Sequence, residues 1–454
     1  MDSKYYLSKQ WILRNEPLIK KHPYLMFNTF TGKQVNLNRS LYLILSEIGK
    51  GASVEELAEN FSEERSTIEQ YINHIKKEWP SLFSRDYRII PEYNTASLEN
   101  LKNYEAPVYS FPVSAEIHLT EKCNLRCRHC IYSCSPYTKT DELQPADWIR
   151  VFKEMESHGA VSVTLTGGEI FAYKGINEIL RAIRDINIHF TLLTNGLLIS
   201  REQAELLASP NISLSLSLDG SRAESHDYLR GKGTYARLMK IMDVLTEFHV
   251  WKALSVTLNA KNYTEIEAIL DYAHSHDCYS VGFIFLDDHG RAEQNRELHL
   301  TREMIEEANR KIGELHNKYP GMEVIMLNPS AGITNEKVTT KDNEAVFCTG
   351  STSHISISSE GDIYPCVYAF GSDVFKVGNV QDITLYEAWK TPKWGIMRGG
   401  IHLDELKGCS TCKMKHFCSL KSCRVRAFKF RNSLYDKPEC SEVQTSVQQL
   451  HFGI

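Results

Sequence analysis

Residues 113–330 alternate short β-rich runs with amphipathic helical patterns. The runs with strand character are Ala115–Leu119, Ser162–Thr166, Phe190–Thr194, Ile212–Leu218, Leu254–Leu258 and Ser280–Phe285. Helical spacing falls near 145–158, 176–186, 201–208, 235–248 and 262–275, with a further helix over 302–317. Repeated βα units predict an α/β domain with a parallel sheet, either open or a partial barrel. Both forms bind ligands at the carboxyl ends of the strands.

Residues 1–100 predict a smaller domain, which a linker over 101–112 joins to the βα region. Tyr24–Asn28 and Lys33–Leu37 alternate around Thr31-Gly32, as in a hairpin. Two helical patterns begin after Asn38 and Ser53, which are expected to be their N-caps, and a third helix is expected over 66–78. A hairpin with three helices is the outline of a winged-helix domain, which could be a binding module or only a stabilising appendage.

Composition favours a cytoplasmic protein with metal-binding cysteines. The 454 residues carry a formal charge of -5, contain no apolar run that spans a bilayer and begin without a secretory signal. The mild acidity argues against a nucleic-acid surface, and we expect no membrane partner. Because disulfides are rare in the reducing cytosol, the 12 cysteines are expected to be metal ligands or catalytic groups.

The cysteines fall into two groups, and Cys278 stands apart. Cys123, Cys127, Cys130 and Cys134 follow the first βα strand directly. The second group lies in residues 340–454, where the βα alternation is lost, and consists of Cys348, Cys366, Cys409, Cys412, Cys418, Cys423 and Cys440. This segment has little apolar surface, and we expect its fold to depend on metal.

The CxxxCxxC spacing of Cys123, Cys127 and Cys130 resembles the signature of the radical S-adenosylmethionine (SAM) superfamily. Three thiolates leave one iron of a cubane cluster open, as catalysis requires. The resemblance implies a partial (β/α)6 barrel and a [4Fe–4S] cluster on these three catalytic cysteines. The open iron would bind SAM, which one electron cleaves to a 5′-deoxyadenosyl radical. A structural zinc loop is the alternative, and Cys134 is interpreted as a non-ligand thiol.

Further motifs stand at successive strand ends in the order that this superfamily shows: Thr166-Gly-Gly-Glu169, Thr194-Asn195-Gly196, Ser217-Leu-Asp219-Gly220 with Arg230, and Gly290-Arg291. Glycines allow close approach of the backbone to a ligand. Glu169 can accept from the ammonium group of SAM, and Ser217 and Arg230 are candidates to hold its carboxylate. The cofactor-binding residues implied by the resemblance are Gly167, Gly168, Glu169, Asn195, Ser217, Asp219, Arg230 and Arg291.

The second cysteine group resembles the SPASM extension of radical SAM enzymes, although four residues rather than three separate Cys418 from Cys423. The resemblance implies two auxiliary [4Fe–4S] clusters, hence three in all. The distal cluster would use Cys409, Cys412, Cys418 and Cys440, and the proximal one Cys348, Cys366 and Cys423. Because Asp342 stands where sulfatase-maturing relatives have an eighth cysteine, the proximal cluster is expected to have an open iron or a non-cysteine ligand. Zinc is again the alternative.

The whole arrangement resembles the sactipeptide and ranthipeptide thioether synthases. The segments Thr166-Gly-Gly-Glu-Ile-Phe and Asp287-Asp-His-Gly-Arg are particularly similar to those of the subtilosin-type enzymes. The implied enzyme binds the leader of a ribosomally made precursor peptide with its N-terminal domain. It then joins a cysteine sulfur to a carbon of the core peptide, with flavodoxin or ferredoxin as electron donor. Carbon–carbon cross-linking, epimerisation and side-chain oxidation are alternatives. A non-catalytic redox-sensing regulator with a winged helix is an alternative of another class.

Overall fold

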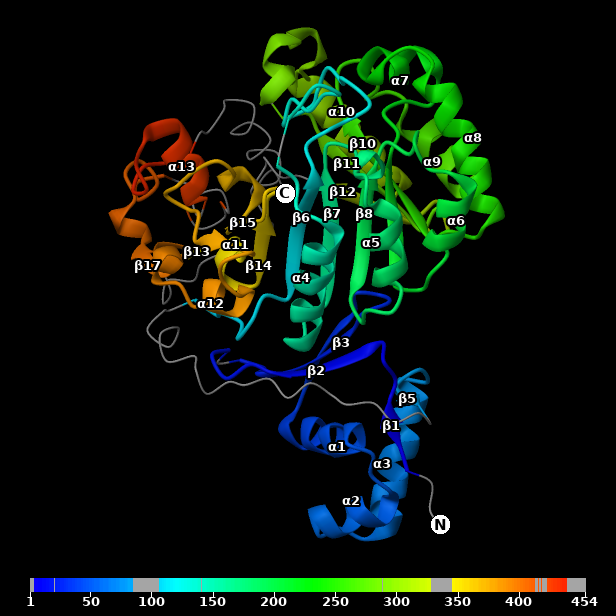
Figure 1. Cartoon of the computed structure of the whole chain (residues 1–454), viewed down its shortest axis with the longest axis vertical. Helices are drawn as coiled ribbons and strands as arrows, with labels where there is room; N and C mark the ends of the chain where they lie inside the picture. Colours follow the sequence, from blue (N-terminus) through cyan, green and yellow to red (C-terminus); the bar gives the residue numbers. More distant parts are fainter. Residues whose placement is uncertain are drawn as a thin grey trace.

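The computed structural model describes residues 4–19, 21–84, 106–139, 141–287, 289–327, 345–412, 415, 418 and 423–438. Its centre is a sheet of ten strands in the order β12-β11-β10-β9-β8-β7-β6-β14-β15-β16 (Figure 1). The run from β6 to β12 is parallel throughout and consists of β6 (Ser114–Thr120), β7 (Ser162–Gly167), β8 (His189–Thr194), β9 (Ile212–Ser217), β10 (Lys252–Leu258), β11 (Ser280–Phe285) and β12 (Glu323–Leu327).

The predicted parallel α/β sheet is confirmed, with each of the six expected strands within two residues of its predicted bounds. The connecting helices are α4 (Pro145–Ser157), α5 (Ile176–Ile183), α6 (Arg201–Leu207), α7 (Ala223–Arg230), α8 (Thr234–Glu247), α9 (Ile266–Ser275) and α10 (Arg302–Leu315). The sequence prediction missed α7 and β12. In the described part of the chain β12 pairs only with β11, so the seven strands form a partial barrel that does not close.

The two faces of the barrel sheet differ in polarity. On β6 the outward side chains Ala115, Ile117 and Leu119 are buried in the main core together with the helices. The alternate positions Glu116 and His118 face the interior, since successive side chains on a strand point to opposite faces. This alternation places the apolar core between sheet and helices and leaves a polar interior.

The C-terminal region extends the barrel sheet. β14 (His354–Ile357) pairs in parallel with β6, and β15 (Asp362–Tyr364) and β16 (Gly378–Asn379) continue antiparallel. The remaining elements are β13 (Ala345–Phe347), α11 (Thr349–Thr352), α12 (Leu385–Trp389), β17 (Arg398–His402) and α13 (Arg424–Arg431). Contrary to the expectation of little apolar surface, Trp389 and Trp394 are fully buried in the barrel's own core. Packing therefore supports this region as well.

The N-terminal region has a separate core and lies below the barrel in Figure 1. It contains a three-stranded antiparallel sheet, β2 (Trp11–Asn15), β3 (Tyr24–Asn28) and β4 (Gln34–Leu37), with helices α1 (Arg39–Gly49), α2 (Val54–Phe61) and α3 (Arg65–Glu78). Two short strands, β1 (Tyr6–Leu7) and β5 (Phe83–Ser84), pair with each other. The hairpin and both caps are confirmed: Asn38 accepts from the Leu41 amide, and Ser53 forms a capping box. β2 was not predicted.

The described half of the predicted linker is packed rather than exposed. Val108 and Phe111 belong to the main core. From β2, the buried Arg14 guanidinium donates to the carbonyls of Phe111 at 2.7 Å and Gly159 at 2.9 Å and pairs with Glu16. Glu16 in turn accepts from the Ser110 amide at 2.6 Å. This buried network attaches the N-terminal region to the bottom of the barrel.

No helix in the described ranges is long and apolar enough to cross a membrane.

Candidate active site

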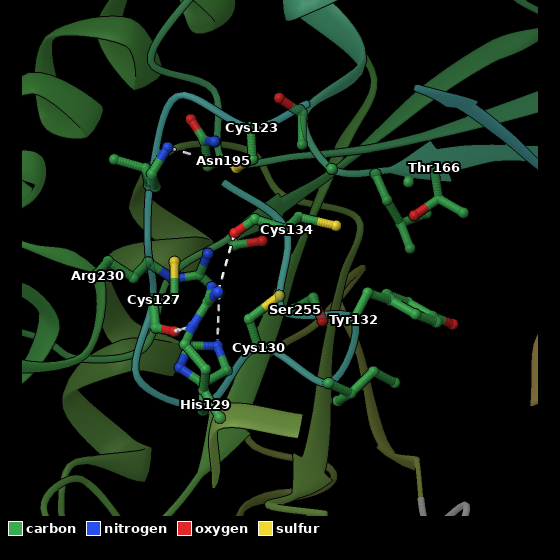
Figure 2. A pocket seen from close by; sticks show the side chains of 18 of the residues that line it. Cys123, Cys127, His129, Cys130, Tyr132, Cys134, Thr166, Asn195, Arg230 and Ser255 are labelled. Atoms are coloured by element: carbon green, nitrogen blue, oxygen red, sulfur yellow. Dashed lines mark hydrogen bonds between the residues drawn. The ribbon is translucent and has the colours of Figure 1, made fainter. Parts of the chain in front are cut away.

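A cavity opens at the carboxyl ends of the barrel strands, and the loop after β6 forms one wall of it (Figure 2). Cys123, Cys127 and Cys130 line this cavity together with Cys134. Burial raises the pKa of Cys123 to about 12 and also raises that of Cys127, so both are neutral thiols until a metal displaces their protons. The three predicted cysteines are therefore brought together in one desolvated pocket.

The end of β11 fixes the conformation of this cysteine loop. The Arg291 guanidinium donates to the carbonyls of Cys127 at 2.7 Å and Cys134 at 3.0 Å. A Cβ on Gly290, whose φ is +64°, would lie 2.5 Å or less from the carbonyl oxygens of Cys130 and Ile131. Arg291 was predicted to bind the cofactor; it does line the cavity, but its side-chain hydrogen bonds to Cys127 and Cys134 hold the loop. The role of Gly290 was missed.

Gly167 and Gly168 stand at the end of β7 on the cavity wall. A Cβ on Gly167, at φ +125°, would lie 2.1 Å from the carbonyl oxygen of Thr120, and one on Gly168 would lie 2.3 Å from that of Lys122. The glycines are thus required first by the close approach of β7 to the backbone after β6. The same lack of side chains leaves the cavity wall open for a ligand.

Glu169 does not line the cavity. Its carboxylate is buried and accepts from the Thr194 hydroxyl at 2.6 Å, the Asn195 amide at 2.8 Å and the Phe171 amide at 3.1 Å. These bonds tie the end of β7 to the end of β8 and position Asn195, which is on the wall. The structure thus gives Glu169 protein partners where the sequence suggested a ligand ammonium group.

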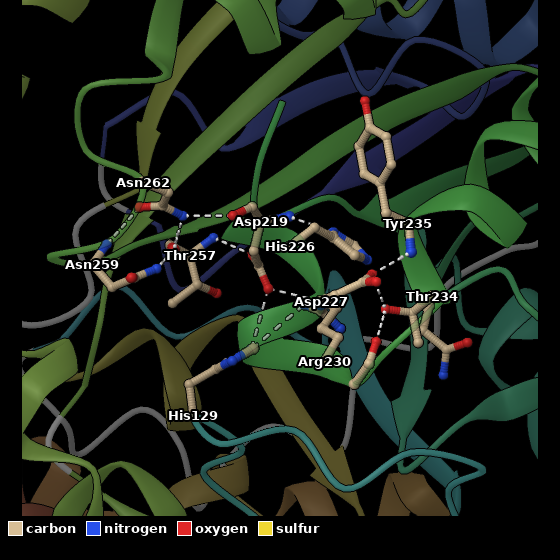
Figure 3. A network of polar contacts seen from close by, with 12 residues as sticks. His129, Asp219, His226, Asp227, Arg230, Thr234, Tyr235, Thr257, Asn259 and Asn262 are labelled. Carbon is tan, nitrogen blue, oxygen red and sulfur yellow. Dashed lines mark hydrogen bonds and ion pairs between the residues drawn. The ribbon is translucent and has the colours of Figure 1, made fainter. Parts of the chain in front are cut away.

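Arg230 on α7 reaches the cavity wall from a buried polar network (Figure 3). Its Nε donates to Asp219 Oδ2 at 2.6 Å, and Asp219 Oδ1 accepts from the Thr257 amide at 2.8 Å. Although burial alone would raise it, the pKa of Asp219 lies below its usual value because of the nearby Arg230 guanidinium. Asp219 is off the cavity wall and orients Arg230, whereas Ser217 is on the wall beside its register partner Ser255.

His129 and Tyr132 are wall residues that the sequence reasoning missed, although His129 lies inside the cysteine motif. Burial lowers the pKa of His129 to about 4, so its ring is neutral at pH 7. His129 Nε2 lies 3.5 Å from Asp219 Oδ2. Its Nδ1 is buried and has no hydrogen-bond partner within the described ranges, which leaves one polar atom available to a ligand.

The C-terminal cysteines are only partly gathered. Burial and the neighbouring Cys423 raise the pKa of Cys348 to about 11. Burial raises the pKa of Cys366 as well, and Cys348 and Cys423 lie close enough to raise it further. Cys409 is buried and Cys412 exposed, while Cys440 and Asp342 lie outside the described residues. The three proximal cysteines are thus neighbours, and the ligand sets of both auxiliary clusters stay predictions.

The chemistry of the donor sets fits iron–sulfur clusters and SAM. Among the described residues, no group of three ligand-type side chains is already placed to hold a single metal ion. Three cysteines on a desolvated cavity, an arginine for a carboxylate and an unpartnered His129 atom suit a larger cluster with an organic ligand. A partial parallel barrel with such a cavity defines the class of radical SAM proteins.

Comparisons with known protein families support the radical SAM assignment. Residues 117–273 match the radical SAM superfamily, and residues 348–413 match an iron–sulfur cluster-binding domain of the SPASM type. The chain therefore contains a radical SAM domain and a SPASM domain. Its cofactors are SAM and [4Fe–4S] clusters.

Several relatives are similar over much of the chain. The AdoMet-dependent heme synthase of Methanosarcina barkeri is 29% identical over 338 residues, 71% of this chain and 94% of that protein. AlbA, the antilisterial bacteriocin subtilosin biosynthesis protein of Bacillus subtilis, is 27% identical over 300 residues, 64% of this chain and 63% of AlbA. The crystal structure of Streptococcus suis SuiB bound to precursor peptide SuiA has a TM-score of 0.73 at 18% identity and covers 97% of this chain and 99% of SuiB.

Proposed function

We propose that this chain is a radical SAM maturase that installs cysteine thioether cross-links in a ribosomally made precursor peptide. The observation that carries the proposal is the proximity of the Cys348, Cys366 and Cys423 triad to the SAM cavity. His118 connects the two sites: its ring packs edge-on against Tyr132 of the cavity wall and against Phe370, four residues after Cys366, with ring centroids 4.8 Å apart in both pairs. A sulfur-binding site beside a radical source suits the joining of a thiol to a carbon.

The residues of the first cavity have separable tasks in this proposal. Cys123, Cys127 and Cys130 hold the [4Fe–4S] cluster, and Arg230 and Ser217 receive the carboxylate of SAM. Asp219 and Glu169 act behind the wall, where they orient Arg230 and Asn195. When bound, the cofactors supply a 5′-deoxyadenosyl radical that takes a hydrogen from the peptide. The thiol would release its proton, and the surplus electron would pass to an auxiliary cluster, so the thioether peptide would be lighter by two hydrogens, one from carbon and one from sulfur.

The N-terminal region is suited to bind a leader peptide. In the described sheet β4 pairs only with β3, so its other edge exposes backbone groups to which an extended peptide can add as a strand. SuiB, crystallised with a precursor peptide, shares the fold over 97% of this chain, which includes this region. AlbA, a subtilosin biosynthesis protein, supports a peptide substrate further.

The test is anaerobic reconstitution with dithionite, SAM and a candidate precursor peptide that contains cysteine, chosen from short reading frames beside the gene. We expect release of 5′-deoxyadenosine and a peptide lighter by two hydrogens whose cysteine no longer reacts with iodoacetamide. An unchanged mass would indicate epimerisation, and a lighter peptide with a reactive thiol would indicate a carbon–carbon bond. Cys130→Ala should abolish both products, while Cys134→Ala, a matched change of a neighbouring cavity thiol, should keep them.

A further inference from the structure

The interior of the barrel below the cavity is polar in a regular way. Glu116 on β6 is in register with Thr164 on β7 and with Ser356 on β14. Thr164 is in register with Thr191, and Thr191 with Ser213. Parallel barrels normally fill their interior with bulky branched apolar side chains. A row of small hydroxyl groups with one carboxyl is therefore unlike a packed core and resembles the lining of a ligand site.

Among the described residues, Glu116 has no partner of opposite charge. Within the described ranges no lysine or arginine pairs with it, and its register neighbours are uncharged. The titratable groups near it are His118, Tyr132 and His354. Burial lowers the pKa of both histidines to about 4 and raises that of Tyr132, so all three are neutral at pH 7. Burial likewise raises the pKa of Glu116 to about 7. Partly buried carboxyl groups are normally paired.

Glu116 lies within reach of the cavity floor. Its neighbour two residues on, His118, is in register with Thr166, which lines the cavity. Two residues of parallel strand span roughly 7 Å. His118 is itself 2% exposed, and its Nε2 has no hydrogen-bond partner in the described part of the chain. The same strand face therefore presents two polar groups that the protein leaves unsatisfied.

We propose that Glu116 is a recognition site in the barrel interior for a basic side chain, lysine or arginine, of the substrate peptide. A lysine has a flexible four-carbon stem that can extend from the cavity floor down the polar row. The lysine ammonium would supply the positive charge that no described residue places beside Glu116, and it would donate hydrogen bonds to the surrounding hydroxyl groups. This inference rests on the proposed function for its substrate class, but the carboxyl itself can be tested without a peptide.

The first test uses charge reversal on both partners. Wild type, E116Q and E116K are compared on the precursor peptide and on versions with each core lysine or arginine replaced by glutamate. We expect E116Q to lower kcat/KM at least tenfold, mainly through KM, and E116K to prefer one glutamate peptide. Thr164→Val, an uncharged change in the same row, should leave the charge preference intact. A loss confined to kcat, or a preference that E116K does not alter, would overturn the proposal.

The second test needs no peptide. Infrared difference spectra of the SAM-loaded holoenzyme at about pH 6, below the raised Glu116 pKa, are recorded with n-butylammonium chloride and with n-butanol. The cation should convert one protonated carboxyl to carboxylate in wild type but not in E116Q, and n-butanol should not. No difference between wild type and E116Q would refute cation binding. Failure to process the peptide together with a positive infrared result would instead refute only the proposed reaction.

Discussion

Replacement of Arg230 by lysine should weaken SAM binding while the fold is kept. Arg230 Nε is already engaged with Asp219 at 2.6 Å, Nη2 lies 3.5 Å from His129 Nε2, and the side chain lines the cavity. A lysine is a point charge without a planar fork, so it cannot serve two carboxylates with the same geometry. Because Asp219 is fully buried, its charge must be compensated first. In the lysine variant the ammonium therefore pairs with Asp219, and the carboxylate of SAM loses its hydrogen bond.

The expected magnitude is the loss of one charge-assisted hydrogen bond, about 1.5–3 kcal/mol. This corresponds to a roughly 10- to 150-fold rise in the Kd of SAM. Anaerobic calorimetry on cluster-loaded protein measures the affinity, and a thermal melt should show little change. Arg128→Lys is the control, because Arg128 is half-exposed and meets Glu297 only at 3.5 Å. Equal SAM affinity in R230K and wild type would refute the assignment of Arg230.

Three other perturbations test the structure. Gly290→Ala should displace the cysteine loop and lower the iron bound per chain, whereas Gly321→Ala, also at positive φ but with no atom within 4 Å of the added Cβ, should keep full iron content. Arg14→Met should destabilise the fold by about 3–5 kcal/mol, because it leaves the buried Glu16 unpaired; a melting temperature equal to wild type would contradict this. The pKa of Asp219 in the folded chain is lower than its ordinary value of 3.8. Ionised Asp219 therefore stabilises the fold fully at pH values above 3.8, and this stabilisation is lost as pH falls through the lower folded-state pKa. Melts of cluster-free wild type and D219N should therefore differ at pH 7 and converge as pH falls below the folded-state pKa of Asp219.

Local signals in the sequence predicted local structure well. The hydrogen bonds that Asn38 and Ser53 make to amides three residues on depend on neighbouring residues alone. The six barrel strands were recognisable because runs of β-rich residues alternate with helical periodicity at regular intervals. Short elements without a strong pattern, such as α7 and β12, were missed, since a few residues carry too little periodicity.

The sequence predicted which segments of the chain form the candidate site. Cys123, Cys127, Cys130, Gly167, Asn195 and Arg230 do line one cavity, because the carboxyl ends of parallel strands meet at one edge. The direction of each side chain was not predictable. Glu169 and Asp219 belong to the right motifs but are not lining residues; they lie behind the wall and bond the wall residues Thr194 and Arg230 respectively.

The sequence by itself therefore determined the parallel α/β fold, the cysteine signature of the iron–sulfur site and the strand ends that surround it, because those features depend on neighbours along the chain. Only the tertiary structure decided that β14 pairs with β6, that the segment after Cys366 approaches the cavity wall, and that Glu116 faces the interior with no lysine or arginine paired to it among the described residues. These features depend on register and packing between segments far apart in sequence, where the choice among alternatives is made by burial and hydrogen bonding in the folded chain.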